Sequence, residues 1–330
     1  MLSGYMRSGG YSKLVATALG TLLLLFTASM AAQVTPAAGS NQLDTDLIQA
    51  VDHLKDTSVT VRQLLQQGAH IEARDNKGQT VLIHAAARGD LAVVQTLLEE
   101  GAQIEARTTP GGRTALITAA VRGRADVAKL LLEKGAKIDG KDDEGSTALM
   151  IATSGGQNTE VAHLLLARHA PLETTDNMGD TALYRAAWHG RLEGVQLLLD
   201  SGATVEVKNN AGATPLIAAA DPGIVKLLLA KHADLEAKNN DGATPLIVAS
   251  RMGHLEAMNV LLQNGAKIEV KDKAGRTALT AAAEAGASPA VKLLLEKGAQ
   301  PDKMTVNAAK AHPDVAKVIE DAQHNGTAQK

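Results

Sequence analysis

Hydrophobic and polar residues alternate in a fixed order over residues 75–301. Each cycle begins with a polar turn, which is followed by a short apolar segment with paired alanines, as in residues 81–87. After a Gly-Asp break comes a second apolar segment, residues 91–99, whose apolar side chains recur at helical spacing. A Gly-Ala pair ends this segment, with glycine in the usual position after a helix. The pattern predicts a unit of turn, helix, turn, helix and extended arm.

This unit recurs seven times, with a glycine two residues before a threonine as its clearest mark. The threonine hydroxyl can cap the first helix, and the Thr-to-Thr spacings are 34, 33, 34, 33, 30 and 33 residues. Helices this short are not stable alone, so the period predicts a stacked array in which neighbouring units bury each other's apolar faces. The marker pairs are Gly78/Thr80, Gly112/Thr114, Gly145/Thr147, Gly179/Thr181, Gly212/Thr214, Gly242/Thr244 and Gly275/Thr277.

Two units carry histidine where the others have the helix-ending glycine. These residues are His169 and His232, each followed by alanine. Histidine adopts left-handed backbone more readily than most residues with a side chain. We therefore expect strained helix ends at both positions; the alternative is a ligand role.

The turn D/N-x-x-G-x-T-P/A-L, followed by paired alanines, a Leu-rich segment and Gly-Ala, resembles the ankyrin repeat over roughly residues 43–321. The resemblance implies an all-α ankyrin-repeat solenoid of stacked helix-turn-helix units with short β-hairpin or extended tips. It also implies that the tips and first helices line a concave groove that binds other proteins, without catalysis or a cofactor.

The ends of the array are atypical, as terminal repeats should be when one face meets water. Residues 43–74 lack the Gly/Thr mark and are expected to form an N-terminal capping unit before the seven repeats of residues 75–301. Residues 302–321 are expected to form a C-terminal capping unit, and residues 322–330 a disordered tail.

Two departures from the family pattern are consistent along the chain. The residue three after each marker threonine, histidine in the family, is Ile83, Ile117, Met150, Tyr184, Ile217, Ile247 or Thr280, so we expect apolar packing there. An acidic row, Glu72, Glu105, Asp139, Glu173, Glu206, Glu236 and Glu269, precedes by two residues a mainly basic row, Arg74, Arg107, Lys141, Thr175, Lys208, Lys238 and Lys271. We interpret these rows as a solvated charge ladder that contributes less than about 1 kcal/mol per pair.

The N-terminus has the parts of a secretory signal. Arg7 and Lys13 precede an apolar stretch, residues 14–28, and small residues follow. Residues 1–32 are thus expected to be a signal peptide cleaved after Ala31 or Ala32, with a flexible lead-in at residues 33–42. The alternatives are a buried helix or an uncleaved anchor, which would place the protein at a membrane. A cleaved signal predicts a periplasmic or secreted protein.

Composition narrows the functional classes. The chain has a formal net charge of -3 and no cysteine, which argues against nucleic-acid binding and excludes disulfides, thiol catalysis and Cys-ligated zinc. No metalloprotease, nucleophile-elbow, P-loop or dinucleotide motif is present, and no EF-hand loop supports a calcium site at a turn tip. We therefore expect no catalytic residues, no metal and no cofactor.

Only five aromatic residues occur, and the single tryptophan falls at the end of a predicted first helix. Tryptophan, tyrosine and arginine dominate interface hot spots, so Trp188 is a candidate binding anchor; alternatively, it covers a gap between repeats. Repeat irregularities on either side suggest a distorted contact zone over residues 147–244. The residues expected to bind a partner are Trp188, His189, Tyr184, Arg88, Arg122, Arg251, Met252, Lys77, Arg113 and Arg276.

These features favour an exported, monomeric adaptor that binds proteins through its groove. One alternative is an accessory or inhibitor protein that binds and stabilises one periplasmic enzyme. Another is a secreted effector that acts on the proteins of a host. Co-purification from the periplasmic fraction distinguishes the first two, and recovery in the medium or in target cells distinguishes the third.

Overall fold

The computed structural model describes residues 42–53, 58–155 and 159–327. Within them the chain forms eighteen helices and no strand, so the prediction of an all-α repeat solenoid is confirmed. The only β-type pairing in this part of the chain is two isolated bridges at turn tips, Arg74 with Thr80 and Lys141 with Thr147. The expected signal peptide (1–32) and all but the last residue of the lead-in lie outside the described residues.

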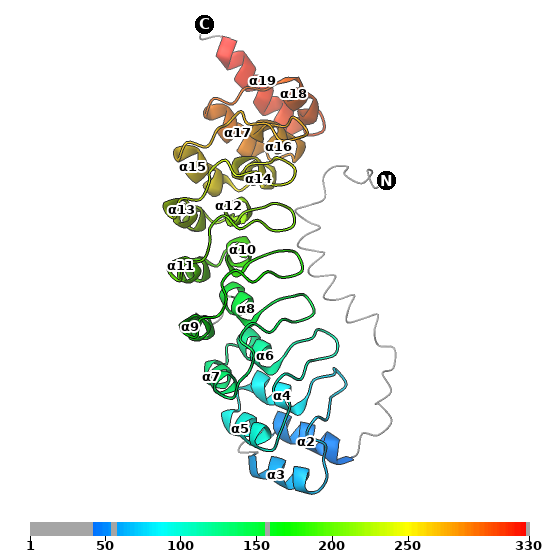
Figure 1. The fold of residues 1–330 in the computed structure, drawn as a ribbon. Coiled ribbons are helices and arrows are strands. Elements are labelled where there is room, and N and C mark those ends of the chain that lie inside the picture. The colour runs from blue at the N-terminus through cyan, green and yellow to red at the C-terminus, as the bar shows by residue number, and fades with distance from the viewer. Residues whose placement is uncertain (1–41, 54–57, 156–158, 328–330) are drawn as a thin grey trace. The chain divides into compact units, whose positions relative to one another are not determined.

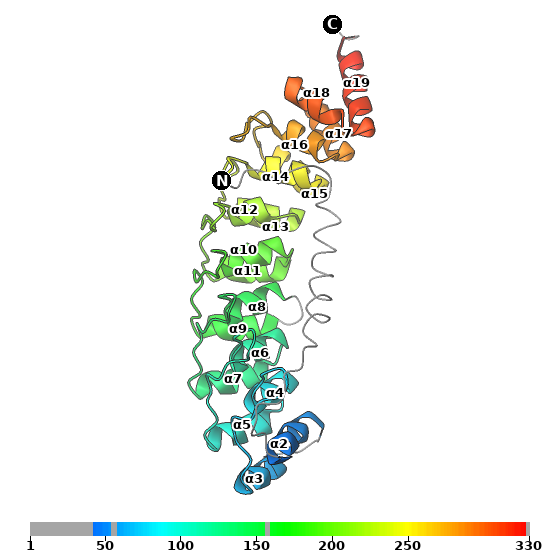
Figure 2. The same cartoon turned by 90° about the vertical axis from the view of Figure 1, so that its right-hand side faces the viewer.

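The described residues fall into two compact units, 42–209 and 210–327. In the first unit, the first helices of successive repeats form one row, the second helices form another, and the connecting loops lie along one edge (Figures 1 and 2). Its helices are α2 (Gln42–His53), α3 (Ser58–Gln66), α4 (Val81–Arg88), α5 (Leu91–Glu99), α6 (Ala115–Val121), α7 (Ala125–Glu133), α8 (Ala148–Ser154), α9 (Thr159–Ala167), α10 (Ala182–Trp188) and α11 (Leu192–Asp200).

The second unit repeats the same two-row arrangement. Its last helix continues through Thr327, into the segment predicted as a disordered tail. In this part of the helix, His324 Nδ1 lies 2.8 Å from the carbonyl oxygen of Glu320. The helices are α12 (Pro215–Ala218), α13 (Pro222–Ala230), α14 (Pro245–Met252), α15 (Leu255–Gln263), α16 (Ala278–Glu284), α17 (Ser288–Glu296), α18 (Lys303–Ala309) and α19 (Pro313–Thr327).

The marker threonines begin the first helices, as predicted. Six of them accept a hydrogen bond at Oγ1 from the backbone N–H three residues later, at 3.2–3.4 Å. The exception is Thr214, whose buried Oγ1 has no partner among the described residues and whose helix, α12, has only four residues. The first turn of this repeat is therefore less well stabilised than its equivalents.

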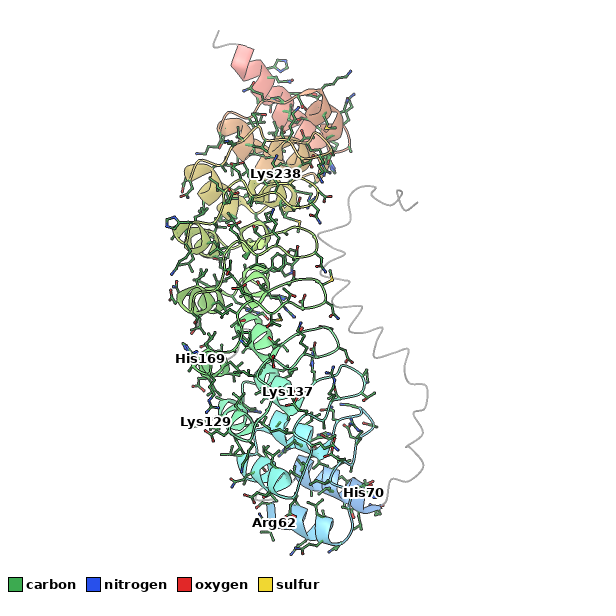
Figure 3. All side chains as sticks on the ribbon, viewed as in Figure 1. Arg62, His70, Lys129, Lys137, His169 and Lys238 are labelled. Carbon is green, nitrogen blue, oxygen red and sulfur yellow. The ribbon has the colours of Figure 1, made fainter. Side chains whose placement is uncertain are left out.

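The helix ends confirm the expectation for the two histidines. His169 has φ of 58° and His232 has φ of 65°, both in the left-handed region, and His169 lies at the end of α9 (Figure 3). The equivalent glycines are also left-handed; Gly101 and Gly135, for example, have φ of 94° and 92°.

An aliphatic core lies between the two helix rows. Fully buried leucines from both rows meet there, such as Leu82 and Leu97. Five of the positions that carry histidine in the family are buried apolar residues, as expected: Ile83, Ile117, Met150, Ile217 and Ile247. At Thr280 the expectation of apolar packing is wrong, because its buried hydroxyl forms a 2.8 Å hydrogen bond with the hydroxyl of Thr305.

At five positions the acidic row is bound to the main chain. A carboxylate on one arm accepts a hydrogen bond from a backbone N–H of the next repeat, 31 or 32 residues later, at 2.7–2.9 Å. Charge-assisted hydrogen bonds of this kind are stronger than neutral ones. We call these residues the arm carboxylates: Glu72, Glu105, Glu173, Glu236 and Glu269.

The basic row also binds the main chain of the neighbouring repeat. Arg74 Nη1 donates to the carbonyl oxygens of Gly78 and Arg107, both at 2.7 Å. Arg107 Nη1 donates to the carbonyl oxygen of Lys141 at 2.9 Å, and Lys141 Nζ donates to that of Thr175 at 2.6 Å. At these positions the two rows therefore join successive repeats through the backbone.

The turn tips are held by aspartate or asparagine, as predicted for residues of this type. Asp142 Oδ1 accepts from the backbone N–H groups of Glu144 and Ser146 at 3.0 and 2.8 Å, and Asp176 and Asp272 do the same in their own tips. Tips of adjacent repeats are joined as well, since the N–H of Asn177 donates to the carbonyl oxygen of Glu144 at 3.0 Å. The tips thus form a continuous hydrogen-bonded edge within each unit.

Among the described helices, none has the length and apolarity needed to span a bilayer.

Candidate protein-binding surface

The structure places seven of the expected binding residues in the first unit and three in the second. Trp188 and His189 lie at the end of α10, and Arg88 and Arg122 lie at the equivalent ends of α4 and α6. Lys77 and Arg113 lie in the tips before these helices. In the second unit, Arg251 and Met252 end α14, and Arg276 lies in the tip before α16.

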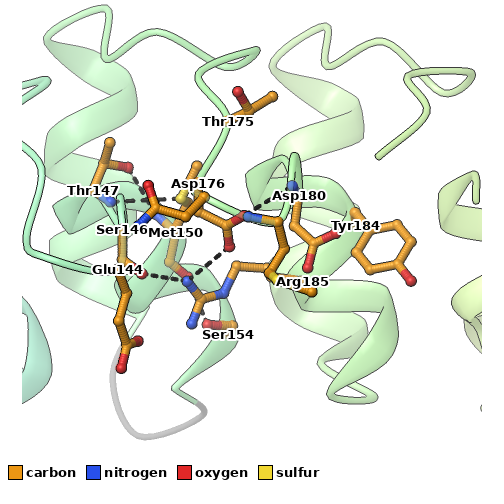
Figure 4. Close-up of polar contacts among 12 residues, drawn as sticks. Glu144, Ser146, Thr147, Met150, Ser154, Thr175, Asp176, Asp180, Tyr184 and Arg185 are labelled. Atoms are coloured by element: carbon orange, nitrogen blue, oxygen red, sulfur yellow. Dashed lines mark hydrogen bonds and ion pairs between the residues drawn. The ribbon is translucent and has the colours of Figure 1, made fainter. Parts of the chain in front are cut away.

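A hollow of about 410 Å³ lies beside Trp188 in the first unit. Two neighbouring tips and the end of α10 form its walls, and Figure 4 shows several of the polar contacts that hold it together. Of the ten expected residues, only Trp188 and His189 line it. We call it the Trp188 hollow; its lining residues are Asp143, Glu144, Asp176, Asn177, Met178, Asp180, Arg185, Trp188 and His189.

The two tips that form the hollow are fixed to each other. Asn177 donates from its backbone N–H to the carbonyl oxygen of Glu144 at 3.0 Å, and from Nδ2 to the carbonyl oxygen of Asp143 at 2.9 Å. Within its own tip, Asp176 Oδ1 accepts from the N–H groups of Met178 and Asp180 at 2.8 and 2.9 Å. Side-chain and main-chain hydrogen bonds therefore connect the wall that carries Met178 to the neighbouring tip and close its own turn.

Arg185 connects α10 to both tips. Its Nη1 donates to Ser146 Oγ and lies 3.4 Å from Asp176 Oδ2 (Figure 4). The Arg185 side chain is only 21% exposed. Arg185 is therefore used within the fold and joins α10 to the hydrogen-bonded tips.

Burial shifts the titration of several groups around the hollow. The pKa of Asp180 is raised chiefly by desolvation, although a hydrogen bond from Asn209 Nδ2 opposes the shift. The pKa of His189 is lowered, first by desolvation and then by the positive charges of Arg185 and Arg191. His189 is consequently neutral at pH 7, and it does not offset the carboxylates of the hollow.

Tyr184 does not line the hollow. Its side chain points away from Arg185 on α10 (Figure 4) and forms a hydrogen bond with the side chain of Asn209. Burial, together with the charge of Asp180, raises the pKa of Tyr184 to about 12. Four residues before Trp188 on a seven-residue helix, it occupies a different environment from the tryptophan.

Three of the expected arginines have partners within the fold. Arg88 donates to the carbonyl oxygen of Asp52, and Arg113 Nε lies 3.9 Å from Asp142 Oδ2. Arg276 lies 2.7 Å from the buried carboxylate of Asp272 and 3.4 Å from Glu284. Burial raises the pKa of Asp272, but hydrogen bonds from Arg276 and its positive charge outweigh this effect, so the net pKa is lowered. Arg276 thus supports its own tip.

The remaining expected residues are exposed. Lys77, Arg122, Arg251 and Met252 all present side chains to solvent, and Met252 is 45% exposed. They lie at tips or at the ends of first helices, but the described hollow does not include them.

Sequence reasoning missed Met178 and the carboxylates of Asp143, Glu144 and Asp176 as members of one site. A signal for Met178 was present, because the equivalent residue of the other tips is lysine, glycine, glutamate, alanine or aspartate, as in Lys77 and Glu144. The acidic residues carried no separate signal, since aspartate is also the ordinary residue of such turns.

A family model described as ankyrin repeats (three copies) matches residues 47–142, 137–209 and 215–305. The chain belongs to the ankyrin-repeat family. A search of curated proteins with the chain finds no match. Ankyrin repeats generally mediate protein–protein interaction, and no group of three or more potential metal ligands occurs within the described ankyrin array.

Proposed function

We propose that this ankyrin-repeat protein is an exported adaptor that binds a protein partner through the face formed by its tips and first helices. The Trp188 hollow is the centre of that contact. The observation that carries the proposal is the exposure of Trp188, which is 53% accessible beside a hollow whose walls are joined by hydrogen bonds. An exposed tryptophan next to a preformed hollow is the arrangement expected of an interface hot spot.

Export is supported by the N-terminal pattern and by the absence of cysteine. Residues 33–330 carry 31 basic and 36 acidic residues, which favours a protein partner over nucleic acid. The exported protein acts as a monomer in the periplasm or outside the cell.

A photocrosslinking experiment tests the binding role. A photoreactive phenylalanine analogue replaces Trp188 in the full chain, and the matched control carries it at Lys129, an exposed residue of α7 in the second-helix row (Figure 3). We expect one or a few specific adducts from position 188 and none of them from position 129. Equal labelling from both positions, or none from 188 in cells that express the protein, would contradict the proposal.

Cell fractionation with N-terminal sequencing tests export. We expect the protein outside the cytoplasm with a new N-terminus at Ala32 or Gln33. A chain that keeps residues 1–31 and remains in the cytoplasm would contradict export while leaving the binding role open to the crosslinking test.

A further inference from the structure

Two large apolar side chains are exposed at the Trp188 hollow. Trp188 is 53% exposed and Met178 is 68% exposed, although most large apolar residues described in this chain are buried. The indole comes from the end of α10 and the methionine from the tip of the same repeat. Exposed apolar side chains beside a hollow indicate a site where another molecule binds.

The charge of the hollow selects the kind of molecule. Four carboxylates line it, those of Asp143, Glu144, Asp176 and Asp180, against a single guanidinium, that of Arg185. Asp176 is already engaged by Arg185 and by the turn, and Asp143 is shared with Arg107 at 2.8 Å. Glu144 forms no salt bridge with any residue in the described part of the chain, and its side chain is exposed. The hollow therefore repels acidic groups and attracts a cation.

A guanidinium satisfies both features at once. Arginine stacks its planar group on an indole face and donates in the same plane to carboxylates, whereas the ammonium of lysine is a compact, strongly hydrated charge. A volume of about 410 Å³ accommodates one or two side chains and their flanking backbone. The walls are fixed beforehand by the Asn177 and Asp176 hydrogen bonds, so little ordering is needed on binding.

We propose that the Trp188 hollow binds an arginine side chain within an exposed, basic segment of the partner protein. The guanidinium stacks on Trp188, its charge is neutralised by Glu144 and Asp143, and the flanking apolar surface of the segment covers Met178. This inference rests on the proposed function and names the chemistry of the partner at the same surface.

The test uses the full mature chain and synthetic peptides. The probe is acetyl-Gly-Ser-Ala-Arg-Ala-Ser-Gly-amide; matched peptides carry lysine or citrulline in place of arginine, citrulline being nearly isosteric but uncharged. Because Trp188 is the only tryptophan of the chain, its fluorescence reports directly on occupancy of the hollow. We expect a saturable change with the arginine peptide, an affinity about tenfold weaker with citrulline, and several-fold weaker with lysine.

Variants of the protein test the roles of the carboxylates. Glu144→Gln and Asp143→Asn should each weaken the arginine peptide about three- to tenfold and leave the citrulline peptide unchanged. The matched control Glu256→Gln, an exposed carboxylate of α15, should change neither. Circular dichroism verifies that the variants keep their helix content.

Three outcomes would overturn the inference. They are equal binding of the arginine and citrulline peptides, binding that is unaffected by both carboxylate variants, and binding of free arginine or spermidine as tight as that of the peptide. If position 188 crosslinks a partner in cells but the arginine peptide does not bind, the arginine inference fails and the adaptor function stands. If position 188 crosslinks nothing while the peptide binds, the adaptor function fails and the chemistry of the hollow stands.

Discussion

Left-handed backbone at the ends of the second helices is supplied by glycine in most repeats, and His169 and His232 are the described exceptions at this position. A side chain in this region costs about 1–2 kcal/mol through contact of Cβ with the following carbonyl oxygen. His169 is exposed, and no hydrogen bond of its side chain offsets that cost in the described structure. The strain therefore comes from the Cβ of His169 itself, and a residue without Cβ at this position would remove it.

Replacing His169 with glycine should stabilise the protein by about 0.5–1 kcal/mol. The relief of strain exceeds the extra backbone entropy that glycine brings to the unfolded chain, which is about 0.5–1 kcal/mol. Urea unfolding followed by circular dichroism measures the change. The matched control is Gly135→His, where a Cβ would meet no heavy atom of a neighbouring part of the chain within 4 Å. It should lower the free energy of unfolding by a similar amount. A loss of stability in His169→Gly would contradict the strain argument.

Single residues also show where sequence reasoning succeeded and where it stopped. The threonine caps and the left-handed histidines were predictable because they depend on the backbone of their own turn. The direction of Tyr184, toward Asn209 and away from the hollow, was not, because it depends on the packing of one repeat against the next. The ion pair between Arg276 and Asp272 was missed for a related reason, since the sequence does not reveal which of several nearby groups a long side chain selects.

At the scale of elements, the joints between repeats are made by side chains that bind main chain. Each arm carboxylate accepts from a backbone N–H of the next arm, and basic residues such as Arg74 and Arg107 donate to carbonyl oxygens of the next tip. Both rows were visible in the sequence, but these bonds to the main chain were not, because backbone partners 31 to 34 residues away carry no mark in the sequence.

Replacing Glu105 with alanine should lower the free energy of unfolding by about 1 kcal/mol, because the bond from the Lys137 N–H to Glu105 Oε1, 2.8 Å long, is lost at an exposed joint. Hydrogen exchange gives the specific readout, since the Lys137 amide should lose protection while amides inside α7 keep theirs. Lys137 lies on the arm that follows α7 (Figure 3).

Glu133→Ala is the matched control for this joint. Glu133 forms a 3.3 Å ion pair with Arg168 on the exposed surface, so its removal should cost less than about 0.5 kcal/mol. Unchanged exchange of the Lys137 amide in Glu105→Ala would show that the arm carboxylate does not hold the joint.

At the scale of the whole molecule, stability is distributed unevenly because each repeat contacts only its neighbours. The repeat that begins at Thr214 has the shortest first helix of the array, four residues, and a buried hydroxyl without a partner in the described structure. The boundary between the two compact units falls between residues 209 and 210, in the turn with which this repeat begins.

Hydrogen exchange of the intact protein should show α12 as the least protected of the first helices between α4 and α16. Exchange of the amides of residues 216–218 should be at least about tenfold faster than that of the equivalent amides of α14, because a missing cap and a missing turn each remove about 1 kcal/mol or more of local stability. Mass spectrometry of peptic fragments measures both helices in one experiment. Equal protection of α12 and α14 would contradict this distribution of stability.

The joints between repeats have a further consequence for how such a protein changes over generations. A carboxylate that accepts a hydrogen bond from a backbone N–H does not depend on the side chain of the donor residue. The donors Gln103, Lys137 and Thr204 already differ in their side chains. Duplication, loss or exchange of a whole repeat therefore leaves the hydrogen-bonded joints intact on both sides. The exposed side chains of each repeat are then free to change toward new ligands while the joints between repeats stay the same.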